Sequence, residues 1–132
     1  VGVLTPGSEG STFGGYPLAS VVGTYAIKTL VDEKLAYNAS LRGKQLMDGL
    51  NEIKKEFSSK IKIVRGKGLL TAFEMFDDKN LDGHHISVEL MNHGIYAKET
   101  HHTTIRLAPA LTISNTQIDN LLSGVRAVVK SL

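Results

Sequence analysis

The spacing of apolar residues changes along the chain, and this change limits the possible folds more than any other feature. From Glu33 onward, apolar residues recur at helical intervals and predict a long amphipathic helix; they are Leu35, Ala39, Leu46, Leu50, Ile53 and Phe57. After Ser58-Ser59 the pattern changes to two β-rich runs, 61–65 and 68–76, split by glycines. Helical spacing returns near the C-terminus. A chain with these two periods mixes helices and strands in one core.

Two further helices are predicted, one before the long helix and one after the two β-rich runs. Pro17 suits the first turn of a helix to about Asp32, and its many Ala, Val and Leu residues predict that it is mostly buried. A short helix is expected from Asp82 or Gly83 to Met91, ended by Gly94.

Two further strands are expected at 95–98 and 104–108. Ser114-Asn115-Thr116-Gln117 then fits a capping box. The helix after it carries an apolar stripe of Ile118, Leu121, Leu122, Val125, Val128, Val129 and Leu132. The predicted order is ααββαββα, an α+β fold in which helices cover a small, mostly antiparallel sheet.

Composition excludes several classes of protein. Fifteen Lys and Arg against thirteen Asp and Glu give a net charge of +2, spread along the chain, so no nucleic-acid partner is indicated. No apolar run reaches the roughly 18 residues of a membrane span, and without cysteine there is no disulfide or thiolate metal site. Because the chain opens on Val1-Gly2-Val3-Leu4, we expect it to be a piece of a longer product.

Two segments offer chemistry, each with a structural alternative. The glycine-rich loop 6–17 presents the hydroxyls of Ser11 and Thr12 and free backbone N–H groups ahead of a helix, as a phosphate cradle or a plain surface turn. Arg106 alternates with apolar neighbours on a predicted strand, where it either pairs with an internal carboxylate or clamps a ligand carboxylate.

Other polar groups favour a structural interpretation. In Arg65-Gly66-Lys67-Gly68 the glycines let the chain bend between strands, which we favour over phosphate binding. The five histidines, His84, His85, His93, His101 and His102, do not have the spacing of a metal site, so no metal is expected.

Four segments together resemble, in order and spacing, the C-terminal part of the class III pyridoxal-phosphate-dependent aminotransferases. They are Gly10-Ser11-Thr12-Phe13-Gly14-Gly15-Tyr16-Pro17, Val64-Arg65-Gly66-Lys67-Gly68-Leu69-Leu70, Ala97-Lys98-Glu99-Thr100-His101 and Ile105-Arg106-Leu107-Ala108-Pro109. The resemblance implies the C-terminal small domain of a fold-type I transferase at 33–132. It also implies that 1–32 holds the phosphate loop and a helix from the end of the large domain.

The resemblance also implies a site. Ser11 and Thr12 match the residues at the phosphate of pyridoxal 5'-phosphate in the neighbouring subunit of a homodimer, and Arg106 matches the arginine that holds the substrate carboxylate. The substrates are expected to be small amino acids and 2-oxo acids. The family's Schiff-base lysine lies shortly upstream of the loop, so we expect no catalytic residue in this chain, which should be inactive alone.

Within the family, Lys98-Glu99-Thr100-His101 favours the branch that acts on ornithine over the acetylornithine and GABA branches. A non-catalytic dimerisation module is the third alternative. Two residues depart from the family pattern: Tyr16 replaces the usual Asn before the proline, and His102 replaces a common Gly. The expectation for location is a soluble protein of the cytoplasm or the mitochondrial matrix.

Overall fold

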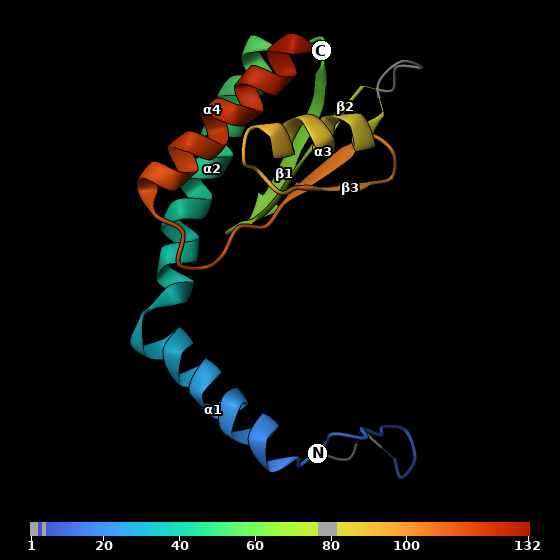
Figure 1. Ribbon diagram of the computed structural model, residues 1–132, viewed down its shortest axis with the longest axis vertical. Helices are drawn as coiled ribbons and strands as arrows, with labels where there is room; N and C mark the ends of the chain where they lie inside the picture. Colours follow the sequence, from blue (N-terminus) through green and yellow to red (C-terminus); the bar gives the residue numbers. More distant parts are fainter. Residues whose placement is uncertain (1–2, 4, 77–81) are drawn as a thin grey trace. The chain divides into compact units, whose positions relative to one another are not determined.

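The computed structural model describes residues 3, 5–76 and 82–132. By their internal contacts the residues form two compact units, Val1–Lys34 and Leu35–Leu132, which are described separately (Figure 1). None of the helices among the described residues is both long and apolar enough to cross a membrane.

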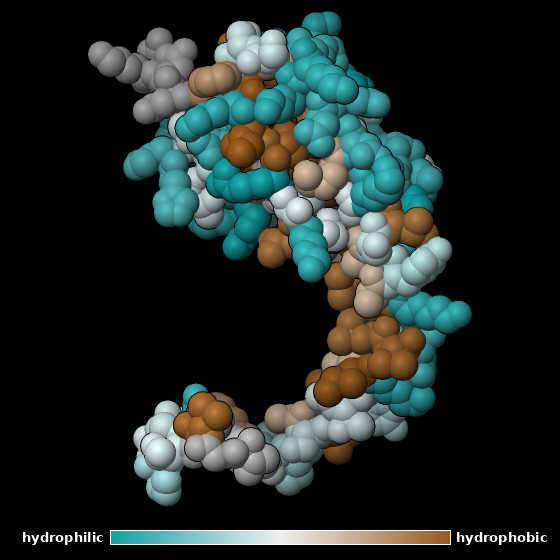
Figure 2. All heavy atoms as spheres, turned by 180° about the vertical axis from the view of Figure 1, so that it is seen from behind, coloured by the Kyte–Doolittle hydropathy of each residue, from teal (hydrophilic) through white to brown (hydrophobic). Residues whose placement is uncertain are grey.

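The first unit consists of the glycine-rich loop and helix α1, Pro17–Asp32, with Pro17 in its first turn as predicted. Helix α1 has no buried residue, and the prediction that it is mostly buried is therefore wrong for this chain. Its apolar side chains lie on the surface (Figure 2); they include Leu18, Val21, Val22, Tyr25, Ile27 and Val31. Apolar composition makes burial favourable, but burial also needs a covering surface, which the described residues of this unit do not supply.

The second helix, α2, runs from Leu35 to Glu56 and begins two residues later than expected. Glu33 instead forms the C-cap of α1, and Lys34 has a left-handed backbone with φ of 51°. This conformation interrupts the helical hydrogen-bond ladder between the two helices.

The second unit contains a four-stranded sheet of β1 (Ile61–Lys67), β2 (Leu70–Met75), β3 (Lys98–Thr100) and β4 (Thr104–Leu107). The strands lie in the order β1-β2-β4-β3, and every neighbouring pair is antiparallel, which confirms the α+β prediction. Strand β3 begins at Lys98 rather than at residue 95. Ile95 and Ala97 are buried in the core, and this burial explains why apolar and polar residues alternate there. Pairing with β4, however, begins only at Lys98.

A two-residue turn joins β1 and β2. Gly68 has a φ of +57° there, and β2 starts at Leu70 rather than at residue 68. A glycine in the first turn position is typical of such hairpins. The backbone of Gly68 packs directly against Gly43 of α2.

The other two helices have the predicted end signals. Helix α3, Gly83–Asn92, has Asp82 as its N-cap, and Gly94 follows it with a φ of +74°. Helix α4, Asn115–Ser131, has the predicted capping box: Gln117 N–H donates to Ser114 Oγ at 3.3 Å, and Ser114 N–H donates to Gln117 Oε1 at 2.9 Å.

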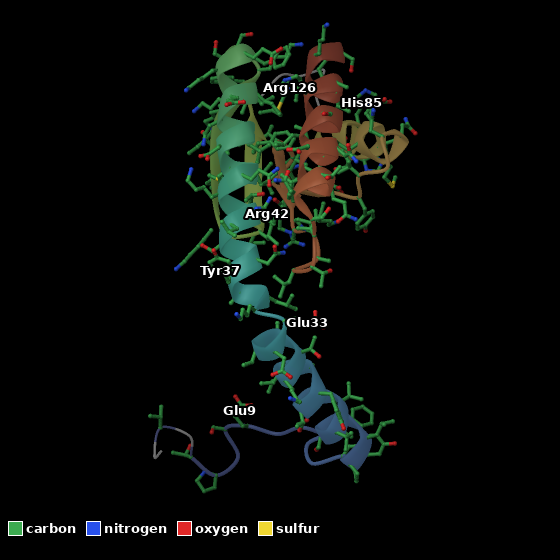
Figure 3. All side chains as sticks on the ribbon, turned by 90° about the vertical axis from the view of Figure 1, so that its left-hand side faces the viewer. Glu9, Glu33, Tyr37, Arg42, His85 and Arg126 are labelled. Atoms are coloured by element: carbon green, nitrogen blue, oxygen red, sulfur yellow. The ribbon has the colours of Figure 1, made fainter. Side chains whose placement is uncertain are left out.

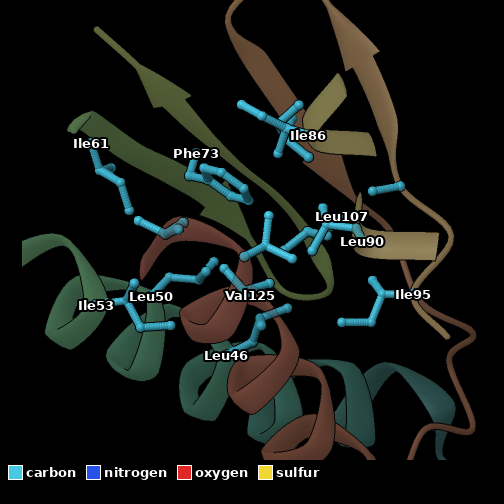
Figure 4. Close-up of a cluster of buried hydrophobic side chains, with 14 of the residues drawn as sticks. Leu46, Leu50, Ile53, Ile61, Phe73, Ile86, Leu90, Ile95, Leu107 and Val125 are labelled. Carbon is cyan, nitrogen blue, oxygen red and sulfur yellow. The ribbon is translucent and has the colours of Figure 1, made fainter. Parts of the chain in front are cut away.

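Helices α2, α3 and α4 and the sheet share one hydrophobic core. Figure 4 shows Leu50 of α2, Phe73 of β2 and Val125 of α4 in this apolar interior, and all three are fully buried. Helices α2 and α4 run side by side (Figures 1 and 3), and Arg126 of α4 donates to Glu56 of α2 at 2.9 Å. The outward-pointing residues of the sheet, such as Arg106 and Leu70, remain exposed.

Candidate functional site

The loop before α1 is organised by two turns. Gly14 N–H donates to Ser11 O at 3.2 Å, and Tyr16 N–H donates to Phe13 O at 3.0 Å. The Phe13 and Tyr16 rings meet edge to face with centroids 6.4 Å apart. Gly15 has a φ of +75°, a backbone region that glycine enters without steric cost.

The polar groups of this loop are available to a ligand. Ser11 and Thr12 are exposed, and neither hydroxyl bonds to another residue of the described part of the chain. Tyr16 is the N-cap of α1 but makes no side-chain capping bond, so the first N–H groups of the helix are not capped by it. An asparagine at this position could accept a hydrogen bond from a backbone N–H of the first helical turn. With Tyr16 in place of the usual asparagine, that capping bond is absent. Hydroxyls beside an uncapped helix start are a donor set that fits a phosphate dianion.

Arg106 lies in a row of residues across the open face of the sheet. In β4 it is paired with Ala72 of β2 on one side and with Lys98 of β3 on the other. Ala72 is in turn paired with Arg65 of β1. Paired residues of antiparallel strands point to the same face, so three cations and one small residue form this row. We call Arg65, Ala72, Arg106 and Lys98 the cationic row.

Glu74 balances the charge at one end of the cationic row. Its carboxylate accepts from Lys62 Nζ and from Arg65 Nη1, each at 2.8 Å. The hydrogen bond from Lys62, followed by that from Arg65, holds the pKa of Glu74 below its ordinary value. Arg65 therefore has an internal carboxylate partner. Arg106 has none within 4.0 Å among the residues described.

The turn between β3 and β4 has an unusual backbone. His101 and His102 both have positive φ, 52° and 61°. Gly83 N–H donates to His102 O at 2.7 Å, and a side chain at Gly83 would collide with that oxygen. The left-handed backbone at residue 102 is one that glycine adopts easily, which gives a physical reason for the family's glycine there. Within the described residues, His, Asp and Glu form no group of three that could hold a metal.

The predicted site residues thus fall into two groups. Ser11 and Thr12 share one turn of the first unit, whereas Arg106 lies on the sheet of the second unit beside Lys98. The sequence reasoning missed Lys98 as a neighbour of Arg106. The signal was the matching alternation of Lys98-x-Thr100 and Thr104-x-Arg106, which becomes informative once the two strands are known to form a hairpin.

The glycine-rich loop ahead of α1 and nearly all of the small α+β unit lie within a single family match. The model of the family described as aminotransferase class III matches residues 1–129, and the chain belongs to this family. Among curated relatives, the mitochondrial ornithine aminotransferase of Arabidopsis thaliana is 43% identical over 95% of this chain. The ornithine aminotransferase of Staphylococcus carnosus is 43% identical over 96%.

Solved structures show the same fold. An ornithine aminotransferase from Plasmodium yoelii superposes with a TM-score of 0.87 and 35% identity over 97% of this chain. An acetylornithine aminotransferase from Elizabethkingia anophelis gives a TM-score of 0.87 and 33% identity over 98%. The chain spans only 26% and 30% of the lengths of the two curated relatives, and 33% and 34% of the two solved chains.

Proposed function

We propose that this chain is the C-terminal part of an ornithine aminotransferase, which transfers the δ-amino group of ornithine to 2-oxoglutarate and yields glutamate 5-semialdehyde and glutamate. The observation that carries the proposal is the 43% identity to two ornithine aminotransferases over nearly the whole chain. In this proposal residues 1–32 belong to the end of a large domain and 33–132 form the small domain. The exposed apolar surface of α1 supports the first assignment, since it is suited to being covered by further protein.

The cofactor in this proposal is pyridoxal 5'-phosphate, which when bound stores the electrons released as the amino group is transferred. This chain holds the phosphate through the hydroxyls of Ser11 and Thr12 and the N–H groups at the start of α1. Both hydroxyls are exposed and without partners among the described residues, which is what an external phosphate requires. In the proposed homodimer the loop serves the cofactor of the neighbouring subunit.

Arg106 orients the substrate in this proposal. Its guanidinium can donate two parallel hydrogen bonds to one carboxylate, and this fixes both the position and the direction of the substrate. The absence of an internal salt bridge to Arg106 among the described residues favours this role over the structural alternative. Glu74, on the same face of the neighbouring strand β2, is already bonded to Lys62 and Arg65 at 2.8 Å each, which supports this role indirectly.

The test is Arg106→Lys in the full-length enzyme, with the two half-reactions followed separately by cofactor absorbance. Lysine keeps the charge but loses the planar fork, so the KM for 2-oxoglutarate should rise by about tenfold or more, as expected for a charge-assisted bond of about 1.5–3 kcal/mol. We expect a smaller rise in the KM for ornithine, because the reacting amine of ornithine is distal to its carboxylate. Arg126→Lys is the control, because Arg126 pairs with Glu56 on the helices. If both half-reactions of Arg106→Lys match those of the control, Arg106 is only structural.

A second experiment addresses the phosphate loop. Thr12→Ala in the full-length enzyme should weaken cofactor retention by about ten- to a hundredfold, the equivalent of one hydrogen bond to a charged group. Ser8→Ala is the matched control, because the Ser8 hydroxyl is already bonded to Thr5 O at 2.7 Å. Mixing Thr12→Ala with a variant lacking the Schiff-base lysine should restore partial activity if the loop serves the partner's site. Hybrid dimers with no activity would show that Thr12 serves its own subunit.

An acetylornithine aminotransferase is the second candidate, because a structure of that enzyme superposes as well as the ornithine enzyme does. Comparison of kcat/KM for ornithine and for acetylornithine decides between the two. The chain by itself should show no turnover and no specific lysine label after treatment with pyridoxal phosphate and borohydride. One stoichiometrically labelled lysine together with turnover would overturn the expectation that the Schiff-base lysine lies elsewhere.

A further inference from the structure

We propose that Lys98 is a second cationic contact for the carboxylate that Arg106 binds, and that it favours the oxo-acid half-reaction over the ornithine half-reaction. This inference rests on the proposed function, because it assumes that Arg106 faces a substrate carboxylate. It goes further by assigning a substrate-selecting role to a residue of the neighbouring strand.

The first argument is position. Lys98 and Arg106 are directly paired in the β3–β4 ladder, so their side chains leave the same face of the sheet. Directly opposed residues in antiparallel strands have Cβ atoms about 4.5–5.5 Å apart. On the other side of Arg106 lies Ala72, whose short side chain does not fill the space above the sheet beside Arg106. An anion approaching Arg106 from the open face therefore lies within reach of Lys98.

The second argument is charge. Two like charges placed opposite each other on a sheet destabilise it unless an anion lies beside them. Glu74 cannot fill this role for Arg106 and Lys98, since it is engaged by Lys62 and Arg65 at 2.8 Å each. Glu99, which adjoins Lys98 in sequence and starts from the opposite face of β3, forms an ion pair with Lys98, with 3.6 Å between Lys98 Nζ and Glu99 Oε1. Among the described residues Arg106 has no such partner, so a substrate carboxylate at Arg106 supplies the negative charge on the open face, where Lys98 can share it.

The third argument is that the fold holds this pair in place. Strand β3 is only three residues long, but the turn that follows it is fixed to the start of α3 by the bond from Gly83 N–H to His102 O at 2.7 Å. Thr103 O also accepts from Met75 N–H of β2 at 2.9 Å. Lys98 is therefore carried by an anchored hairpin, although its own side chain is 57% exposed and can adjust to a ligand.

The test uses the full-length enzyme with Lys98→Gln, which removes the charge and keeps a polar side chain of similar length. The KM for 2-oxoglutarate in its half-reaction should rise about three- to tenfold, the range between an exposed ion pair and a charge-assisted hydrogen bond, while the limiting rate stays within twofold. The KM for ornithine should change by less than twofold. The KM for 2-oxoglutarate should also increase more steeply with potassium chloride concentration in the wild type than in Lys98→Gln. Salt screens the positive charge of Lys98, which only the wild type carries.

Two further variants make the result specific. Lys67→Gln removes the same charge from the same face of the sheet but from a position paired with Leu70, outside the cationic row, and should leave both KM values unchanged. Lys98→Arg keeps the charge and should keep the KM for 2-oxoglutarate within about twofold.

The inference is overturned if Lys98→Gln leaves both KM values unchanged, as Lys67→Gln does, or if it raises the KM for ornithine as much as the KM for 2-oxoglutarate. It is also overturned if Lys98→Arg raises the KM for 2-oxoglutarate as much as Lys98→Gln. These outcomes remain separable from failure of the proposed function. If Arg106→Lys raises the KM for 2-oxoglutarate and Lys98→Gln does not, only the role of Lys98 fails. If neither variant changes either half-reaction, the proposed role of Arg106 fails as well.

Discussion

Replacing Gly43 by alanine tests how tightly the β1–β2 turn is packed against α2. Gly43 is a buried residue of α2, and a Cβ atom at this position would overlap the backbone Cα, C and O atoms of Gly68. Gly68 has a φ of +57° and belongs to the two-residue turn between Lys67 and Leu70, so it cannot rotate away without disturbing the hairpin.

The expected magnitude is the difference between two effects. Alanine in a helix interior is about 1 kcal/mol more favourable than glycine. Forcing an extra carbon into a packed site costs about 1–3 kcal/mol, and the upper end applies because the obstacle is backbone rather than a movable side chain. The net loss is about 2 kcal/mol, which lowers Tm by roughly 8–16 °C in a domain of 60–100 residues.

Gly49→Ala is the matched control, because it makes the same change in the same helix. There the atoms nearest to the new Cβ atom belong to the side chain of Leu122, which can change rotamer. We expect Gly49→Ala to remain within about 1 kcal/mol of wild type, since its propensity gain offsets a smaller clash. Urea and thermal unfolding of the chain, followed by circular dichroism, measure both variants. A Gly43→Ala chain as stable as Gly49→Ala would refute the packing of Gly43 on Gly68.

Two further predictions concern the sheet. Glu74→Gln should lower stability at neutral pH, and the difference from wild type should disappear on acidification: the pKa of Glu74 is lowered from 4.5, so its contribution is complete above that pH and is lost as the pH falls through the lowered value. Urea unfolding at a series of pH values measures this, and a difference that persists at pH 2 would contradict it. His102→Gly should raise stability by up to about 1 kcal/mol, because glycine relieves the left-handed strain at φ 61°; a lower Tm than wild type would show that the His102 side chain contributes more than its backbone strain costs.

Local features of this fold could be predicted from the sequence because they depend on residues close together in the chain. The capping box of Ser114 and Gln117 joins groups three residues apart, and the apolar spacing of α2 and α4 reflects the helical period itself. The glycines that end α3 and form the β1–β2 turn were visible for the same reason, since positive φ strongly favours glycine. Ser11, Thr12 and Arg106 could likewise be proposed from motifs contained in short segments.

Only the tertiary structure decided which side chains meet across the sheet. Arg65, Ala72, Arg106 and Lys98 form one row because three pairs of strands adopt particular registers, and a shift by one residue would turn Arg106 to the opposite face. The sequence predicted β3 three residues too early for the same reason: burial of Ile95 and Ala97 imitates a strand, whereas pairing with β4 begins at Lys98. Strand register, and with it the choice of Lys62 and Arg65 as partners of Glu74, depends on which strands pair and where the turn between them begins, and the alternation within one strand does not specify its partner.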